Sequence, residues 1–204
     1  YIASEVSFTM GMMFFTVVNA LVFMATLLFV PSMPVKEKLS YGTQLNVLKK
    51  KIIWYSIMAV TLINGALFGF FSYMSDYLRT VTEVSYSVIS ILLMIYGLAN
   101  ITGNVIAGKQ LATNPIRSMI FIPFALFTFY ICIFILGEWL AAMTVIILIL
   151  GILAGYGQNT MQYMITEAAP EAPDFANGLF LLSANLGTTV GAAACGAFIT
   201  FFDK

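Results

Sequence analysis

Side-chain amides are the groups in this sequence whose type and spacing best suit chemistry on a neutral molecule. They lie inside long apolar runs that contain no charged residue: Asn64, Asn100, Asn104, Gln158, Asn159, Gln162 and Asn185. An amide offers both hydrogen-bond donors and an acceptor, so it suits a hydroxyl-bearing or neutral polar solute better than an anion. Because an amide that faces lipid is costly, we expect these side chains to point into a helix bundle or toward a wet cavity.

The spacing of the amides supports an inward-facing role. One run repeats small and amide residues at steps of four, three and four along one helix face: Gly151, Gly155, Gln158 and Gln162. A single amide can equally serve as an interhelical hydrogen bond, at ~0.6 kcal/mol on average. Three amides within Gln158–Gln162 exceed what the packing of one helix needs, so they favour a cavity lining. The predicted substrate cavity is therefore formed by amides and aromatic walls: Asn64, Phe68, Tyr73, Asn100, Tyr156, Gln158, Asn159, Gln162 and Asn185.

Groups that would support catalysis or metal binding are missing from the pattern. The sequence has no His, and its two cysteines, Cys132 and Cys195, lie inside apolar runs as expected of buried thiols. No Ser–His–Asp, Cys–His or paired intramembrane carboxylate arrangement occurs. We therefore predict no enzyme activity, no cofactor and no metal site. The formal net charge is zero and no basic stripe is present, which excludes a nucleic-acid partner.

The runs that carry the amides are long enough to cross a bilayer. There are six of them, at 8–30, 52–75, 84–107, 118–136, 139–165 and 175–202. A bilayer core of ~30 Å needs ~20 apolar residues per helix. Hydrophobic residues make up 61% and charged residues 9% of the chain, against about 25% charged in soluble domains. The sequence therefore predicts an all-α, polytopic membrane protein in contact with the lipid bilayer.

Basic residues set the expected orientation. Seven fall in two loops on one side: Lys36, Lys38, Lys49, Lys50, Lys51, Lys109 and Arg117. Two, Arg79 and Lys204, fall on the other side. The positive-inside rule places the first group in the cytoplasm. The Lys49–Lys51 run is expected to anchor the start of the next helix, with contact to anionic lipid as the alternative.

Pairs of glycines mark expected helix contacts. Three runs each carry two glycines at a spacing of four: Gly65 and Gly69, Gly151 and Gly155, Gly187 and Gly191. This spacing places both glycines of a pair on one face, where helix backbones can approach closely. The pairs fit ordinary packing, or faces on which helices slide during a transport cycle.

The polar stretch at 31–51 is the expected boundary between two parts of the protein. We predict a last helix of an N-terminal half at 1–30, a cytoplasmic linker at 31–51, and a C-terminal half without its last helix at 52–204. The connections within 52–204 are short, so consecutive helices should pack as antiparallel neighbours. The sequence starts at Tyr1 rather than Met, and we expect it to be a fragment of a longer protein.

A loop motif carries a resemblance to a known family. Residues 103–117 read GNVIAGKQLATNPIR. They resemble the cytoplasmic glycine–basic loop between the eighth and ninth helices of the major facilitator superfamily, in the bacterial group that exports drugs, sugars (arabinose-type permeases) and nucleosides. The matching positions are Gly103, Asn104, Gly108 and Lys109, followed by the basic Arg117. The acidic residue of this loop falls on Ala112 or Thr113, so it is absent here. Residues 168–191 and 1–31 resemble neighbouring parts of the same family.

The resemblance implies helices six to eleven of a twelve-helix transporter, with a small-molecule solute bound between two halves in alternating access. Helices seven, eight, ten and eleven would line the cavity, which is the same division that the amides give. It also implies proton-coupled efflux of a sugar, nucleoside or drug across a bacterial inner membrane. No carboxylate lies inside the runs, so the proton carrier is expected in the missing N-terminal half. The alternatives are an uncoupled facilitator of the same fold and a non-transporting membrane receptor or scaffold.

Overall fold

The computed structural model describes residues 8–31 and 41–202. The chain divides into two compact units, Tyr1–Leu39 and Ser40–Lys204. The first contains one helix, α2 (Phe8–Phe29), whose side chains are mostly apolar. Lys36, Lys38 and Lys204, used to predict the orientation, lie outside the described residues, as do residues 1–7 and residues 32–40 of the expected linker. The three-part division predicted from the sequence stays a prediction.

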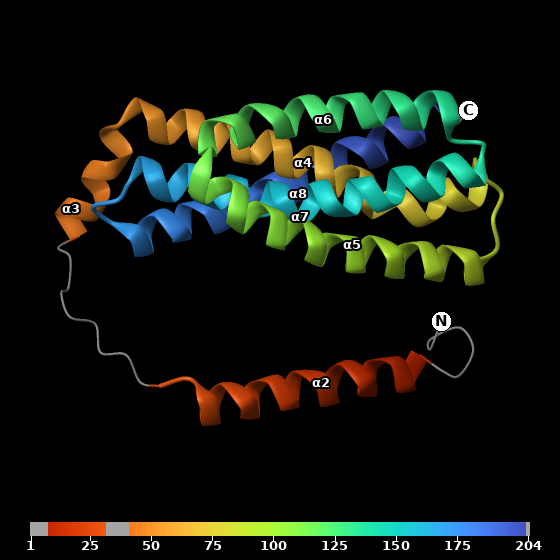
Figure 1. The fold of residues 1–204 in the computed structure, drawn as a ribbon, viewed down its shortest axis with the longest axis horizontal. Coiled ribbons are helices and arrows are strands. Elements are labelled where there is room, and N and C mark those ends of the chain that lie inside the picture. Colours follow the sequence, from red (N-terminus) through yellow and green to blue (C-terminus); the bar gives the residue numbers. More distant parts are fainter. Residues whose placement is uncertain (1–7, 32–40, 203–204) are drawn as a thin grey trace. The chain divides into compact units, whose positions relative to one another are not determined.

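The second unit is a bundle of five long helices preceded by two short ones (Figure 1). The short elements are α3 (Tyr41–Asn46) and the 3-10 helix η1 (Val47–Lys49). The long ones are α4 (Lys51–Thr80), α5 (Tyr86–Thr113), α6 (Pro115–Leu136), α7 (Leu140–Ala168) and α8 (Pro173–Phe202). Together with α2 they make six helices long and apolar enough to cross a membrane within the described residues, where no strand occurs. The predicted all-α membrane fold is confirmed.

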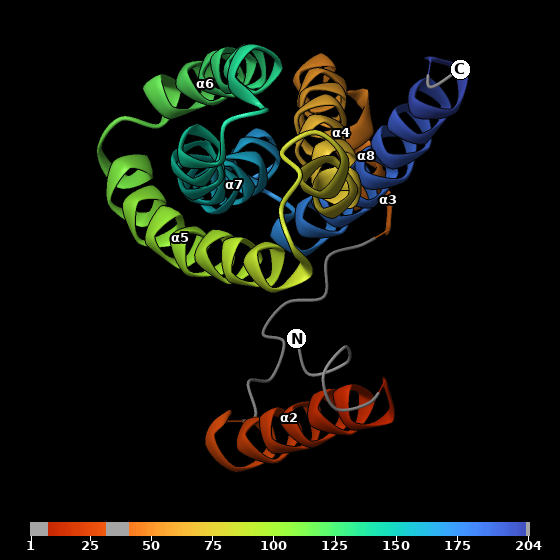
Figure 2. The same cartoon turned by 90° about the vertical axis from the view of Figure 1, so that its right-hand side faces the viewer.

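Helices that run in the same direction form the closest pairs in this unit. α4 packs most extensively on α8, and α5 on α7, while α4 and α5 touch only slightly. Within each pair the contacting residue numbers rise together, as from Gly65 with Gly187 to Gly69 with Gly191. Figure 2 shows α7 between α5 and α6. The expectation that consecutive helices are the main packing neighbours is therefore wrong for α4 with α5 and for α5 with α6.

Glycines explain the pairing, because they let backbone meet backbone. A Cβ atom added to Gly69 would lie 3.0 Å from the Gly191 carbonyl oxygen, and one added to Gly151 would lie 2.5 Å from the Tyr96 carbonyl oxygen. A Cβ atom on Gly155 would overlap the carbonyl group of Asn100. Real Cβ atoms do not approach as closely as those on Gly151 and Gly155 would, so a larger residue there would force the helices apart, and one at Gly69 would make a tight contact.

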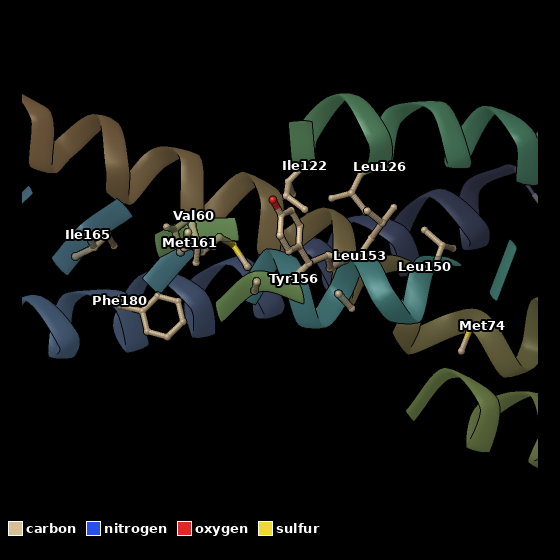
Figure 3. Packing of buried hydrophobic residues seen from close by; sticks show 14 of the residues in the cluster. Val60, Met74, Ile122, Leu126, Leu150, Leu153, Tyr156, Met161, Ile165 and Phe180 are labelled. Carbon is tan, nitrogen blue, oxygen red and sulfur yellow. The ribbon is translucent and has the colours of Figure 1, made fainter. Parts of the chain in front are cut away.

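The apolar core of the second unit centres on α7, which is buried over a larger share of its length than the other spans. Leu150, Leu153 and Tyr156 of α7 meet Ile122 and Leu126 of α6 (Figure 3). In contrast, α6 exposes a row of large side chains, such as Phe134 at 89% exposure. A central α7 is therefore placed to offer different faces to α4, α5, α6 and α8.

Candidate functional site

The Asn64 amide joins three helices. Its side chain is 1% exposed. Its Nδ2 donates to the Ala184 carbonyl oxygen at 2.6 Å and to Thr188 Oγ1 at 2.8 Å, both on α8. Its Oδ1 accepts a hydrogen bond of 2.8 Å from Gln158 Nε2 on α7. Both Asn64 donor groups are used inside the bundle, so this residue fixes α4 against its neighbours and positions Gln158.

A second amide group joins α5 to α7 beside the glycine crossing. Asn159 Nδ2 donates to Asn104 Oδ1 and, at 2.9 Å, to the Gly155 carbonyl oxygen. Asn104 Nδ2 in turn donates to the Asn100 carbonyl oxygen at 2.9 Å and to Asn100 Oδ1 at 3.0 Å. Asn104 is exposed while Asn159 is half-buried. The group therefore extends from the helix contact to the surface of the unit.

Two predicted amides lie apart from these groups. Gln162 Nε2 donates to Asn177 Oδ1 at 3.0 Å, which links α7 to the start of α8. Asn185 is exposed, and among the described residues its Nδ2 donates to the Leu181 carbonyl oxygen of its own helix alone, at 2.8 Å. The predicted single stripe on α7 thus divides among partners, because Gly151 and Gly155 meet α5, Gln158 meets α4 and Gln162 meets α8.

A depression between α4, α5 and α7 brings together two of the predicted amides and one predicted aromatic. Its volume is about 210 Å³, and its lining residues are Leu67, Phe68, Phe71, Tyr96, Asn100, Ala154 and Gln158. The ring of Phe71 lies 6.1 Å from that of Phe68 and 5.1 Å from that of Tyr96, measured between centroids. Three aromatic rings therefore form a continuous wall beside two amides.

Each amide of this depression keeps one group unused. Gln158 donates to Asn64, but its Oε1 accepts no hydrogen bond from any described residue. Asn100 Oδ1 accepts from Asn104, but Asn100 Nδ2 donates to no described residue. The depression thus offers one acceptor and one donor to a bound molecule. We refer to these seven lining residues as the amide–aromatic depression.

The sequence did not single out Tyr96 as a site residue, although a signal was present. Tyr96 precedes Asn100 by four residues and so shares its helix face. Phe71 likewise follows Phe68 by three residues. Extending each predicted amide or aromatic by one helical turn would have found both.

Two predicted aromatics lie elsewhere. Tyr156 is buried, and its hydroxyl donates to Ser118 Oγ at 2.6 Å, so it points toward α6 (Figure 3). Tyr73 lines a different cavity, of about 660 Å³, between α4 and α8 together with Asp76 and Cys195. The structure thus distributes the predicted cavity residues over separate places in the bundle.

The residues of the glycine–basic loop have different surroundings. Gly103 lies against the backbone of Ile152, where a Cβ atom would overlap the Ile152 carbonyl group, whereas a Cβ atom on Gly108 would meet nothing within 4 Å. Lys109 is exposed near the end of α5, and Arg117 is exposed in the first turn of α6. The first part of the motif therefore serves helix contact, and the basic part faces outward.

An ion pair ties the start of α4 to the loop between α7 and α8. Lys50 Nζ lies 2.7 Å from Glu171 Oε1 and donates to the Ala168 carbonyl oxygen at 3.3 Å. The hydrogen bond from Lys50 holds the pKa of the Glu171 carboxyl below its usual value. The two loops therefore share one side of the bundle, and one basic residue of the first is paired with an acid of the second.

The described residues thus define a multi-pass membrane bundle with hydrogen-bonded amides between its helices. The sequence model of the Major Facilitator Superfamily matches residues 1–202, and the chain belongs to this family. It is 26% identical over 198 residues to the MFS-type transporter YtbD of Bacillus subtilis, covering 94% of this chain and 50% of that protein.

Two further relatives carry different names. A probable sugar efflux transporter of Pasteurella multocida is 24% identical over 163 residues, with 79% of this chain and 40% of that protein covered. The transcription regulatory protein OpdE of Pseudomonas aeruginosa is 26% identical over 148 residues, with 71% and 37% covered. The chain thus spans half or less of the length of these relatives. No solved structure matches it significantly.

Proposed function

We propose that the intact protein is a secondary transporter that exports a small, neutral, polar organic solute from a bacterial cytoplasm by alternating access. The amide–aromatic depression is the observation that carries this proposal. Aromatic faces pack against the apolar face of a sugar ring or a nucleobase, while an amide donor and acceptor bind hydroxyl groups at its edge. The name of the Pasteurella multocida relative supports a sugar as the first candidate class.

The size of the depression indicates that it is one part of a site. Complete ligand pockets have volumes of ~300–1,000 Å³, and the depression has about 210 Å³. In transporters built from repeats, the solute lies near the bilayer midplane at the interface between repeats. We infer that a second half of the intact protein supplies the opposite wall and encloses the solute.

Proton coupling commonly uses a carboxylate within the membrane, and the described helices place none in their interior. The acidic residues of this part are all exposed and lie at helix ends or in loops: Asp76, Glu83, Glu138, Glu167, Glu171 and Asp174. We therefore place the proton carrier in the part of the protein outside this chain. The inner membrane of a bacterium, across which a proton gradient is available, is the proposed location.

Export can be tested in inverted membrane vesicles that contain the full-length protein. Pentoses, nucleosides and lipophilic cations are added one at a time while lumenal pH and tracer uptake are recorded. We expect one solute class to release protons from the lumen. Tracer uptake that survives an uncoupler would indicate a facilitator. The absence of flux, with the protein confirmed in the membrane, would favour a non-transporting receptor or scaffold.

The site is tested by Gln158→Leu, which removes the free acceptor of the depression. The matched control is Thr188→Val, which removes a hydrogen-bond partner of Asn64 but lies outside the depression. We expect Gln158→Leu to lower solute uptake at least tenfold and Thr188→Val to leave most of it. Equal uptake rates for Gln158→Leu and the unmodified protein would show that the depression does not bind the solute.

A further inference from the structure

A second cavity, between α5, α6 and α7, is separate from the amide–aromatic depression. Its volume is about 480 Å³. Its lining includes four apolar side chains and two polar ones: Ile106, Phe121, Ile149, Leu153, Gln110 and Arg117. α5 and α6 make few direct contacts, and α7 lies between them (Figure 2). The cavity therefore opens on the outer surface of the bundle, between two helices that are exposed on that surface.

The floor of this cavity is held in place by the core. The Tyr156 hydroxyl donates to Ser118 Oγ at 2.6 Å, and the Tyr156 ring meets the edge of Phe121 with centroids 6.3 Å apart. Gly103 lets the α5 backbone rest directly on that of Ile152 along the same side. The floor of the groove is thus fixed by buried side chains, while two of its apolar walls, Ile106 and Phe121, are exposed side chains.

The polar groups lie at one end of the groove. Gln110 is in the last turn of α5 and Arg117 is in the first turn of α6. Among the described residues, Arg117 forms no ion pair and no hydrogen bond through its guanidinium group. The positive-inside rule places this end at the cytoplasmic leaflet, where anionic headgroups lie. The guanidinium group of Arg117 thus lies at headgroup depth, at one end of a groove lined with apolar side chains.

We propose that this cavity binds one anionic phospholipid, with its phosphate on Arg117 and Gln110 and one acyl chain along the apolar walls. Arginine binds phosphate oxygens through two parallel N–H groups, which gives geometry as well as charge. The acyl chain leaves one apolar surrounding for another, so it adds little selectivity. Discrimination between lipids therefore depends on the charge of Arg117.

Native mass spectrometry of the full-length protein tests this proposal. Phosphatidylglycerol and phosphatidylcholine are titrated separately, and the bound lipid is counted. We expect Arg117→Gln to weaken phosphatidylglycerol binding about fivefold or more, because the variant loses the charged, bidentate contact to the phosphate. Arg117→Lys should keep part of the affinity, because it keeps the charge but not the bidentate geometry.

Two further variants distinguish lipid binding in this cavity from non-specific attraction to basic residues and from binding of a soluble anion. Lys109→Gln removes an exposed charge of the same loop motif that does not line the cavity, and it should leave lipid binding unchanged. Ile106→Trp fills the groove from the exposed side of α5 and should weaken binding of the lipid.

Three results would overturn the proposal. The first is an unchanged phosphatidylglycerol affinity in Arg117→Gln, and the second is an equal loss in Lys109→Gln. The third is full binding in Ile106→Trp, because it would mean that the phosphate is held without an acyl chain. The measurement counts bound lipid, so it does not depend on whether the protein transports a solute.

Discussion

The Asn64→Leu variant tests how much one buried amide contributes to the stability of the helix bundle. The replacement keeps the approximate size of a side chain that is 1% exposed, but it removes three hydrogen bonds, to Ala184, Thr188 and Gln158. At ~0.6 kcal/mol for each interhelical bond, the free energy of unfolding should fall by about 2 kcal/mol.

The assay is reversible unfolding of the full-length protein in mixed micelles with increasing SDS, followed by circular dichroism. Thr188→Val alone removes one of the three bonds and should cost ~0.6 kcal/mol. In the double variant the Thr188 substitution should add almost nothing, because its partner is already absent.

Either of two results would refute this reasoning. If Asn64→Leu lowers the free energy of unfolding by less than about 0.3 kcal/mol, the three hydrogen bonds make no net contribution to stability, as is true of some hydrogen bonds in membrane proteins. Full additivity of the two substitutions would mean that Asn64 and Thr188 do not interact.

The remaining predictions concern glycine contacts and the ion pair. Gly155→Ala should cost about 1–3 kcal/mol in the same unfolding assay, because its Cβ atom overlaps the α5 backbone. Gly108→Ala should stabilise slightly, since nothing lies within 4 Å and Ala is the better helix former. The hydrogen bond from Lys50 holds the pKa of the Glu171 carboxyl below its usual value, so its contribution to stability is present above the pKa of the unfolded chain and lost as the pH falls through the folded pKa. Glu171→Gln should remove this acid-side change from the pH profile of unfolding, and an unaltered profile would contradict the assignment.

The fold class and the helix positions followed from the sequence because both depend on local composition. Charged residues are costly in lipid, so the apolar runs mark the spans directly. The helices extend beyond these runs, and α4 continues through Asp76 and Arg79 to Thr80, since helix geometry persists into the interface where charges are hydrated.

The partners of each face could not be predicted in the same way. Periodicity shows that Gly151, Gly155 and Gln158 share one side of a helix, but not which helix that side meets. In the α4–α8 pair glycine faces glycine, and in the α5–α7 pair glycine faces the backbone of other residues. The segments that meet are far apart in the chain, so a single sequence does not reveal the pairing. The Lys50–Glu171 ion pair could not be predicted from the sequence either, because its two residues come from different loops.

The pairing of α4 with α8 has a consequence for the order in which the protein is made. Asn64 and its partner Thr188 are separated by 124 positions along the chain. During synthesis α4 therefore enters the membrane well before α8 exists, and the Asn64 amide has no interhelical partner on α8 throughout that interval. An unpaired amide in lipid is costly, so the hydrogen bonds that Asn64 makes to α8 stabilise α4 only after α8 has been inserted. Helix α8, the last of these helices to be synthesised, thus completes the hydrogen bonds of α4.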